Sequence, residues 1–240
     1  MQQRSAGAPH EPKLASVAAV IADATRARML CYLLAGEYAS AGELARAASV
    51  TAATASAHLA KLLDAELLVC EQRGRHRYYR LADDEVAHAL EAVALIAERR
   101  THISAWANPT RARLRFARCC YGHLAGQLGV ELFSQLVAKE WLADVQEGYL
   151  LTDQGKTGLQ ELGVDLVGLD KKPAGQRGVA YRCLDWSERR DHIAGMLPKK
   201  MLAHFLQKEW LRRLEGERAL QITALGCKHL ADLLPSVSRL

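Results

Sequence analysis

The chain has 240 residues, of which 50% are hydrophobic and 25% are charged, and its formal net charge is +5. This composition is typical of a folded protein and excludes a disordered or fibrous chain, while the length suffices for two or three small domains. No apolar run approaches the roughly 18 residues that span a bilayer, and residues 1–12 lack the apolar core of a signal peptide. We therefore expect a cytoplasmic protein with no membrane partner.

Two helices are predicted to open the first domain after a disordered leader. Residues 1–12 are polar and show no hydrophobic period. Leu14 and Ile21 belong to a pattern at helical spacing, and a second helical pattern over 27–34 ends before Gly36. Glycine is the usual residue just after a helix C-terminus, so a helix boundary is expected there.

Two further helices are predicted from their capping residues. Ser40 and Glu43 form the capping-box pattern that starts a short helix over 41–48. Thr51 is placed to cap the next helix, over 52–64, which has apolar residues on one face and small polar residues on the other. The short connection between them is typical of a helix-turn-helix.

A basic hairpin follows these helices. Strand-like runs over 67–72 and 76–81 flank Arg73-Gly74-Arg75, where the glycine permits a tight turn. The order of helices and strands predicts a winged helix-turn-helix in a domain that spans 13–104. A longer helix over 83–100 has an apolar stripe and, with the first helix, is expected to form a homodimer.

The C-terminal half contains an internal repeat. The segments that begin at His123 and Lys139 recur at His192 and Lys208, both at an offset of 69 residues. Because two separate segments share one offset, chance similarity is a poor explanation. The repeat indicates that one supersecondary unit occurs twice.

The two units are predicted over 110–169 and 179–240, with a polar linker over 170–178. Each is interpreted as a helix, a turn near 129–130 or 198–199, a second helix, two strands and a closing helix capped by threonine. This order again resembles a winged helix. The predicted fold class is mainly α with small β-hairpins, in which an N-terminal winged helix-turn-helix precedes two tandem winged-helix-like repeats.

The first domain has the chemistry of a DNA-binding module. A helix of about 10 Å diameter fits the major groove, where small polar side chains reach base edges, and a cationic hairpin suits phosphate or minor-groove contacts. The expected partner is double-stranded DNA, and the candidate contact residues are Ser40, Thr51, Thr54, Ser56, His58, Lys61, Arg73, Arg75, His76 and Arg77. The alternative is a winged-helix adaptor whose charges are simply solvated and which does not bind DNA.

Residues 14–100 resemble the ArsR family of bacterial repressors. The resemblance rests on Ala24-Thr25-Arg26-Ala27-Arg28, on Ser56-Ala57-His58-Leu59 and on the hairpin sequence from Arg73 to Leu81. It implies a homodimer formed by the first and last helices of the domain. It also implies that the helix with Thr51, Thr54, Ser56 and His58 reads the major groove, that Arg73, Arg75 and Arg77 lie on the wing, and that DNA is released when an inducer binds.

The metal sites of that family are not reproduced. Its cysteine pair in the first helix of the helix-turn-helix is missing here, and Asp84, His88, Glu98 and His102 do not have the spacing of its second site. The six cysteines of the chain also show no paired metal-finger spacing. No metal is therefore assigned, and the sequence requires no cofactor.

The C-terminal half is expected to sense an effector or to mediate oligomerisation. Thiols, imidazoles, arginines and aromatic rings recur at equivalent ends of the two units, and the candidate effector residues are Arg118, Cys119, Cys120, Tyr121, His123, Arg182, Cys183, Trp186 and His192. Three interpretations stay open: buried core thiols, a pocket in which Arg118, Arg182 and Trp186 hold a small aromatic or acidic molecule, and a soft-metal site or thiol redox switch.

No catalytic motif is apparent in the sequence, so an enzyme is not expected. The predicted function is a DNA-binding transcriptional regulator, a repressor released by a small effector sensed in the C-terminal repeats. The alternatives are a regulator that responds to a soft metal or to thiol oxidation, and a winged-helix adaptor without DNA-binding activity.

Overall fold

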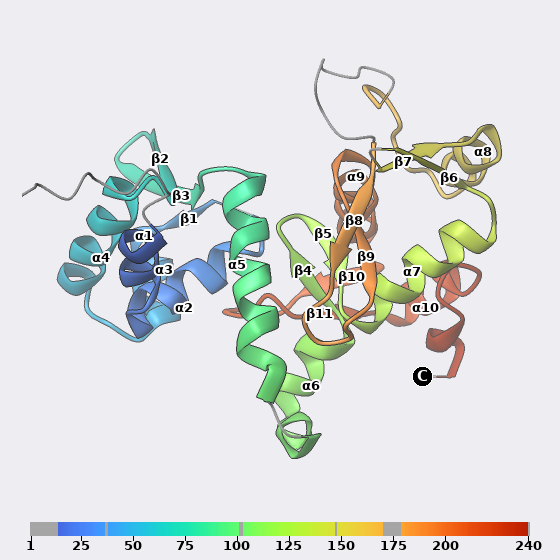
Figure 1. Cartoon of the computed structure of the whole chain (residues 1–240). Coiled ribbons are helices and arrows are strands. Elements are labelled where there is room, and N and C mark those ends of the chain that lie inside the picture. The colour runs from blue at the N-terminus through green and yellow to red at the C-terminus, as the bar shows by residue number, and fades with distance from the viewer. Residues whose placement is uncertain (1–13, 37, 101–102, 147, 170–178, 240) are drawn as a thin grey trace, which may run out of the picture.

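The computed structural model describes residues 14–36, 38–100, 103–146, 148–169 and 179–239 (Figure 1). The predicted leader over 1–12, the linker over 170–178 and His102 lie outside the described residues. Helices and short antiparallel strand pairs make up the chain, which confirms the predicted fold class of mainly α structure with small hairpins. None of the helices in these ranges is long and apolar enough to cross a membrane.

The N-terminal domain is a winged helix-turn-helix. Its elements are α1 (Leu14–Ile21), α2 (Ala24–Leu33), β1 (Ala39–Ser40), α3 (Ala41–Ala48), α4 (Ala52–Asp64), β2 (Leu68–Arg73), β3 (His76–Leu81) and α5 (Asp84–Ala97). The strands form one antiparallel sheet in the order β1-β3-β2. In the wing, Arg73 pairs with His76, and the turn between them starts at Gly74 with a φ of 63°, a conformation that glycine adopts without strain.

The predicted caps determine where the helices of this domain begin. The Ser40 hydroxyl accepts from the Glu43 N–H, and the Glu43 carboxylate accepts from the Ser40 N–H at 2.7 Å, so the capping box is complete. Thr51 caps α4 by accepting from the Thr54 N–H. The apolar faces of these helices then meet in one core, which includes Met29, Leu30, Leu44, Leu59, Leu62 and Leu81.

The C-terminal half repeats one order of elements: hairpin, helix, hairpin, helix. After η1 (Glu98–Arg100), η2 (Ile103–Ala107) and α6 (Pro109–Phe116), the first unit contains β4 (Arg118–Cys120), β5 (His123–Ala125), α7 (Gln127–Ala138), β6 (Leu142–Val145), β7 (Gly148–Leu151) and α8 (Asp153–Glu161). The second contains β8 (Tyr181–Leu184), β9 (Asp191–Ala194), α9 (Met196–Gln207), β10 (Leu211–Arg213), β11 (Leu220–Ile222) and α10 (Ala224–Leu230), and η3 (Pro235–Arg239) follows.

The turns predicted near 129–130 and 198–199 are wrong, because both positions lie inside helices α7 and α9. Pro198 is in the first turn of α9, where a helix does not need the missing N–H. Gly129 is required by packing, since a Cβ there would lie 2.4 Å from the Leu124 carbonyl oxygen. Each unit therefore opens with a hairpin and not with a helix-turn-helix, so its order differs from that of a winged helix.

Hairpins of the two units form backbone hydrogen bonds with each other, and the units share one core. The Leu220 N–H donates to the Ala117 oxygen at 2.9 Å, and the Tyr149 N–H donates to the Ala180 oxygen at 2.7 Å. Ala117 and Ala180 hold equivalent places before the first hairpin of each unit, so the two bonds are reciprocal. Residues from both units then fill a single hydrophobic cluster that includes Leu128, Leu136, Leu197, Phe205 and Trp210.

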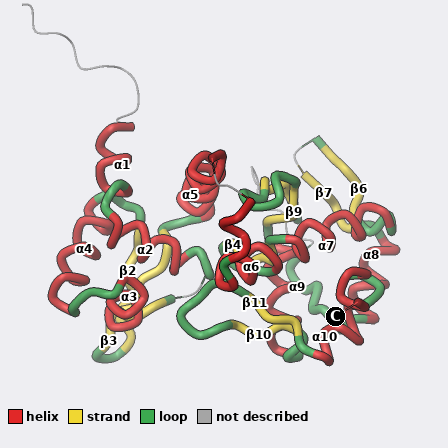
Figure 2. The backbone as a smooth tube through the Cα atoms, turned by 90° about the horizontal axis from the view of Figure 1, so that it is seen from below, coloured by secondary structure: helices red, strands yellow, loops and turns green. Residues whose placement is uncertain are grey.

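Helix α5 is the part of the N-terminal domain that lies beside the repeat units (Figures 1 and 2). Ala87 and Leu90 of this helix belong to the N-terminal core. Glu91, on the same helix, forms an ion pair of 2.5 Å with Arg218 of the second unit, and Asp84 forms one of 2.9 Å with Lys199. Helix α5 is thus in direct contact with both halves of the chain.

Candidate nucleic-acid interface

Helix α4 presents small side chains to solvent at the end of the molecule away from the repeat units (Figures 1 and 2). Its buried face consists of Ala55, Leu59 and Leu62. The exposed residues are Ala52, Ala53, Thr54, Ser56, Ala57, Ala60, Lys61 and Asp64. A helix face without bulky side chains can approach base edges closely, which suits the helix to a DNA groove.

Several candidate contact residues form hydrogen bonds within the helix-turn-helix. The Thr51 and Thr54 hydroxyls are 2.9 Å apart, the Ser56 hydroxyl donates to the Ala52 oxygen, and the Ser40 hydroxyl donates to the Glu43 carboxylate. The threonines and Ser56 remain exposed, whereas Ser40 is partly buried. These bonds orient the hydroxyls on the surface of the helix-turn-helix.

His58 does not lie on the exposed face with Thr54, as the sequence interpretation expected. Its side chain is 17% exposed, and its Nδ1 lies 3.4 Å from the Asp23 carboxylate and 3.5 Å from Arg26 Nη1. Arg26 in turn donates to the carbonyl oxygens of Ala19 and Val20. His58 therefore connects α4 to the junction of α1 and α2, which positions the helix and does not leave the imidazole facing outward.

The wing carries exposed positive charge. Arg75, His76 and Arg77 are exposed at and after the turn. Arg73 pairs with Glu71 at 2.9 Å, and its guanidinium lies 4.5 Å from the centre of the Tyr38 ring. Part of its charge is therefore balanced within the wing. Arg75 and Arg77 are the other two arginines of the turn region, and both are exposed.

Arg80 has a different role from the arginines at the tip. Its guanidinium donates to the Tyr38 hydroxyl and to the carbonyl oxygens of Leu81 and Ala82, each at 3.0 Å. These bonds connect the base of the wing to the segment before β1 and to the end of β3. Arg80 thus fixes the orientation of the wing relative to the rest of the domain.

Four of the candidate effector residues converge between the repeat units. Cys120 and His123 come from the first hairpin of one unit, and Cys183 and His192 come from the first hairpin of the other. All four are buried, and their ligand atoms lie within 4.8 Å of one another. The two imidazoles face each other with their Nε2 atoms 3.1 Å apart.

Burial and mutual contact change the acidity of this cluster. Burial lowers the pKa of His123, since the charged imidazolium is poorly solvated there. The hydrogen bond between the two thiols lowers the pKa of Cys183 and raises that of Cys120. His123, His192 and His88 also lower the pKa of Cys183. The cluster thus favours a thiolate at Cys183.

The other candidate effector residues do not join the cluster. Cys119 lies on the opposite face of β4 from Cys120, as neighbouring strand residues do, and its thiol donates to the Ala35 oxygen at 2.9 Å. The Tyr121 ring lies 4.6 Å from the ammonium nitrogen of Lys199. Both contacts belong to the boundary between the repeat units and the rest of the chain.

The expected pocket of Arg118, Arg182 and Trp186 is not formed. Arg118 is fully buried, donates to Asp185 at 2.9 Å, and lies 4.3 Å from the centre of the Trp186 ring. Arg182 is 58% exposed and pairs with Asp144 at the surface. A fully buried guanidinium that already has an ion-pair partner cannot share a ligand with a surface arginine.

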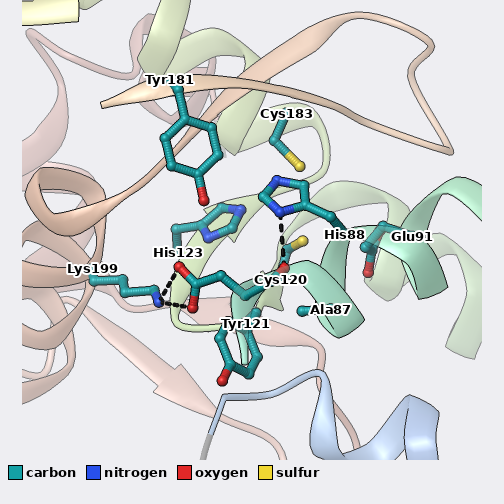
Figure 3. Close-up of a pocket in the computed structure, with 10 residues that line it drawn as sticks. Ala87, His88, Glu91, Cys120, Tyr121, His123, Tyr181, Cys183 and Lys199 are labelled. Atoms are coloured by element: carbon teal, nitrogen blue, oxygen red, sulfur yellow. Dashed lines mark hydrogen bonds and ion pairs between the residues drawn. The ribbon is translucent and has the colours of Figure 1, made fainter. Parts of the chain in front are cut away.

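Helix α5 contributes His88 and Glu91 to the edge of the cluster. A small cavity beside the cluster is lined by His88, Glu91, Cys120, His123 and Cys183, among others, and the ring of His88 faces the two sulfur atoms (Figure 3). The sequence analysis considered His88 only for the second metal site of the family and did not single out Glu91. The sequence signal that could have identified Glu91 is its helical spacing, because it follows Ala87 by four residues and lies next to Leu90 on the face of α5 that is buried.

A helix-turn-helix with an exposed second helix and a basic wing is characteristic of one class of DNA-binding proteins. A family model described as "Helix-turn-helix domain" matches residues 21–71. The chain is also 39% identical over 215 residues to the uncharacterized HTH-type transcriptional regulator YdfF of Bacillus subtilis (strain 168), in a match that covers 90% of this chain and 94% of that protein. The chain therefore belongs to the family of HTH-type transcriptional regulators.

Solved structures also resemble part of the chain. One is the homodimeric winged helix-turn-helix DNA-binding domain of Mb0332 from Mycobacterium bovis, a possible ArsR-family transcriptional regulator, with 29% identity, a TM-score of 0.35, and coverage of 37% of this chain and 82% of that one. Another is the cadmium metal sensor CMTR from Mycobacterium tuberculosis, with 36% identity, a TM-score of 0.30, and coverage of 33% and 82%.

Proposed function

We propose that this regulator binds its operator as a homodimer, with α4 in the major groove and the wing on the flanking phosphates. The observation that carries the proposal is the small, exposed face of α4 in a domain whose wing also exposes Arg75 and Arg77. Thr54, Ser56 and Lys61 are the positions of α4 that can reach DNA. His58 supports this surface by holding α4 against α2.

The wing predicts how affinity depends on salt. Substitution of Arg75 and Arg77 by alanine is expected to reduce the slope of log K against log salt by about 0.9 for each phosphate that the wing no longer neutralises. The measurement is fluorescence anisotropy with a duplex selected by this protein from a random pool. The matched control is Arg190→Ala with Arg212→Ala, which removes two exposed arginines of the repeat units. Equal slopes for wild type and the wing variant would contradict the wing contacts.

The dimer is proposed from apolar side chains that α1 and α5 leave exposed. Leu14 and Val17 on α1 and Val93 and Ile96 on α5 are all exposed, and Ile96 is 57% accessible. Solvent-exposed aliphatic side chains on these two helices agree with the apolar stripes from which dimerisation was predicted. A partner copy that covers them would remove their apolar surface from water.

Charges introduced into this face are expected to separate the protomers. Val93→Glu with Ile96→Glu should raise the dimer dissociation constant by at least about 100-fold, which corresponds to roughly 2.8 kcal/mol. Sedimentation equilibrium measures the change. Val167→Glu is the control, because Val167 is an exposed aliphatic residue of the repeat units, away from α1 and α5. Dissociation by Val167→Glu and not by the double variant would place the interface elsewhere.

We also propose that the protein is a repressor, located with its DNA in the cytoplasm, and that the repeat units sense the signal that releases it. The contacts of α5 with both halves support this proposal, because a change in the repeat units reaches the DNA-binding domain through one helix. In vitro transcription from a promoter that contains the selected duplex tests it. We expect less transcript when the protein is added, and more transcript would indicate an activator.

A further inference from the structure

The four cluster residues have the donor set of a metal site. Two thiols and two imidazoles form one of the common ligand sets of tetrahedral Zn²⁺ sites. Each hairpin supplies one of each kind, since Cys120 pairs with His123 across its hairpin and Cys183 pairs with His192 across the other. The set is thus symmetric between the repeat units, although its two halves lie far apart in the sequence.

The spacing of the ligand atoms also fits one ion. With metal–nitrogen bonds of about 2.0–2.1 Å and metal–sulfur bonds of about 2.3 Å, the edges of a tetrahedron are roughly 3.3–3.8 Å long. The two Nε2 atoms are already 3.1 Å apart, and no pair among the four atoms exceeds 4.8 Å. Contraction by about 1 Å at the longest edge completes the coordination shell.

The groups around the cluster are those that orient metal ligands. His192 Nδ1 lies 3.6 Å from the Asp185 carboxylate, which is itself held by Arg118 and by the Gly126 N–H. A carboxylate behind an imidazole fixes the ring so that its other nitrogen faces the metal. In the structure neither His192 Nδ1 nor His123 Nδ1 has a hydrogen-bond partner among the described residues, and both atoms are buried. Two thiolates would also neutralise a divalent ion in this buried place.

From this geometry we infer that Cys120, His123, Cys183 and His192 bind one thiophilic divalent cation of the Zn²⁺ class, and that its occupancy sets DNA affinity through α5. Binding forms two metal–sulfur bonds, any proton still held by the two sulfur atoms goes to solvent, and nothing is oxidised. The regulatory part of this inference rests on the proposed function, whereas the metal site stands on the cluster alone.

Helix α5 connects the site to the DNA-binding domain. His88 of α5 faces the cluster sulfurs (Figure 3), and its Nδ1 lies 2.9 Å from the backbone carbonyl oxygen of Asp84. On the same helix, Leu90 is part of the DNA-binding domain's core, and Val93 and Ile96 belong to the proposed dimer face. A shift of α5 on metal binding therefore changes the spacing between the two α4 helices of a dimer.

Cobalt substitution tests the site in the full-length protein. Protein stripped with a chelator under reducing conditions is titrated with Co²⁺, whose tetrahedral thiolate complexes absorb in the visible and near-ultraviolet regions. We expect one Co²⁺ per chain, displaced by Zn²⁺. Cys120→Ser with Cys183→Ser should abolish the spectrum, while the control Cys227→Ser, a half-buried cysteine on α10, should keep it.

A second variant separates ligation from a structural role. His123→Cys keeps four donors and adds a third thiolate, so the sulfur-to-cobalt charge-transfer absorption should increase while the stoichiometry stays at one. A purely structural histidine would not change the spectrum in this way. The metal site is overturned if the stripped wild type shows no tetrahedral Co²⁺ spectrum or if the double cysteine variant keeps it.

DNA affinity tests the regulatory part. Stripped and Zn²⁺-loaded protein are compared on the selected duplex, and we expect their dissociation constants to differ by about 5- to 150-fold. His88→Gln should still bind one Co²⁺ but abolish this difference. Equal affinities with a saturated cobalt site overturn regulation and leave the metal site intact. Absence of DNA binding in both states, with a normal cobalt spectrum, instead contradicts the proposed function.

Discussion

Replacement of Arg118 by methionine is expected to lower the free energy of unfolding of the C-terminal half by about 3–5 kcal/mol. Both side chains of the Arg118–Asp185 pair are fully buried, so removal of the guanidinium leaves a carboxylate without its counter-charge. The substitution also removes the bond to the Ser187 hydroxyl and the contact with the Trp186 ring. Asp185 keeps its hydrogen bonds from the Gly126, Ser187 and Glu188 N–H groups, but these do not balance its charge.

Tryptophan fluorescence during urea denaturation measures this effect. All four tryptophans lie in the C-terminal half, at 106, 141, 186 and 210, so the signal does not report on the DNA-binding domain. A chelator and a reductant are included so that a bound metal does not contribute. The matched control is Arg182→Met, which breaks an ion pair at the surface and should cost less than about 1 kcal/mol.

The double variant Arg118→Met, Asp185→Asn distinguishes an unpaired charge from a packing defect. Because it removes both charges, it should be more stable than Arg118→Met alone. Equal midpoints for Arg118→Met and Arg182→Met would show that burial of this ion pair contributes little. That result would contradict the role assigned to Asp185 as a fixed support for His192.

Replacement of Glu91 by alanine is expected to separate the unfolding of the two halves. Glu91 is 3% exposed and its partner Arg218 is 10% exposed, so the variant leaves a buried guanidinium unpaired at the contact between α5 and the repeat units. The expected cost is about 3–5 kcal/mol. Differential scanning calorimetry should show two transitions in the variant where the wild type shows one.

Acidification should also separate the unfolding of the two halves in the wild type. Burial raises the pKa of Glu91, but Arg218 and Arg118 outweigh it, and the pKa lies below the usual value. A lowered carboxyl pKa contributes stability above the pKa of the unfolded chain, about 4.3, and this stability disappears as pH falls through the folded value. We therefore expect the second transition to appear only at pH values below about 4.

Asp84→Asn is the control for both experiments. It breaks the ion pair between Asp84 and Lys199, in which both side chains are at least one-third exposed. Exposed ion pairs contribute little to stability, so this variant should unfold in one transition, as the wild type does. A single transition in Glu91→Ala, equal to that of Asp84→Asn, would contradict the coupling of the halves through α5.

The helix-turn-helix could be predicted because its signals are local. Ser40, Glu43 and Thr51 satisfy N–H groups within three residues of themselves, and the wing needs only two short strands and Gly74. The role of His58 could not be predicted in the same way. Its partners Asp23 and Arg26 are distant in sequence, so only the packing of α4 on α2 decides that the ring turns inward.

The repeat was visible in the sequence, but its architecture was not. Gly129 and Pro198 are typical turn residues, yet both lie inside helices, one because the Leu124 backbone approaches closely and the other because it is in a first turn. A local pattern cannot distinguish a glycine that forms a turn from a glycine that leaves room for a neighbouring segment of backbone. The reciprocal hydrogen bonds between hairpins of the two units depend on their common core and have no signal in either unit alone.

The sequence by itself determined the class of this protein, since capping, turn chemistry and hydrophobic period act over a few residues and specify the winged helix-turn-helix. The tertiary structure alone decided which thiols and imidazoles meet. Strand alternation directs Cys120 to the cluster and Cys119 away from it, and the reciprocal packing of two hairpins brings His123 to His192. Such a site exists only once both units are folded, because each contributes half of it.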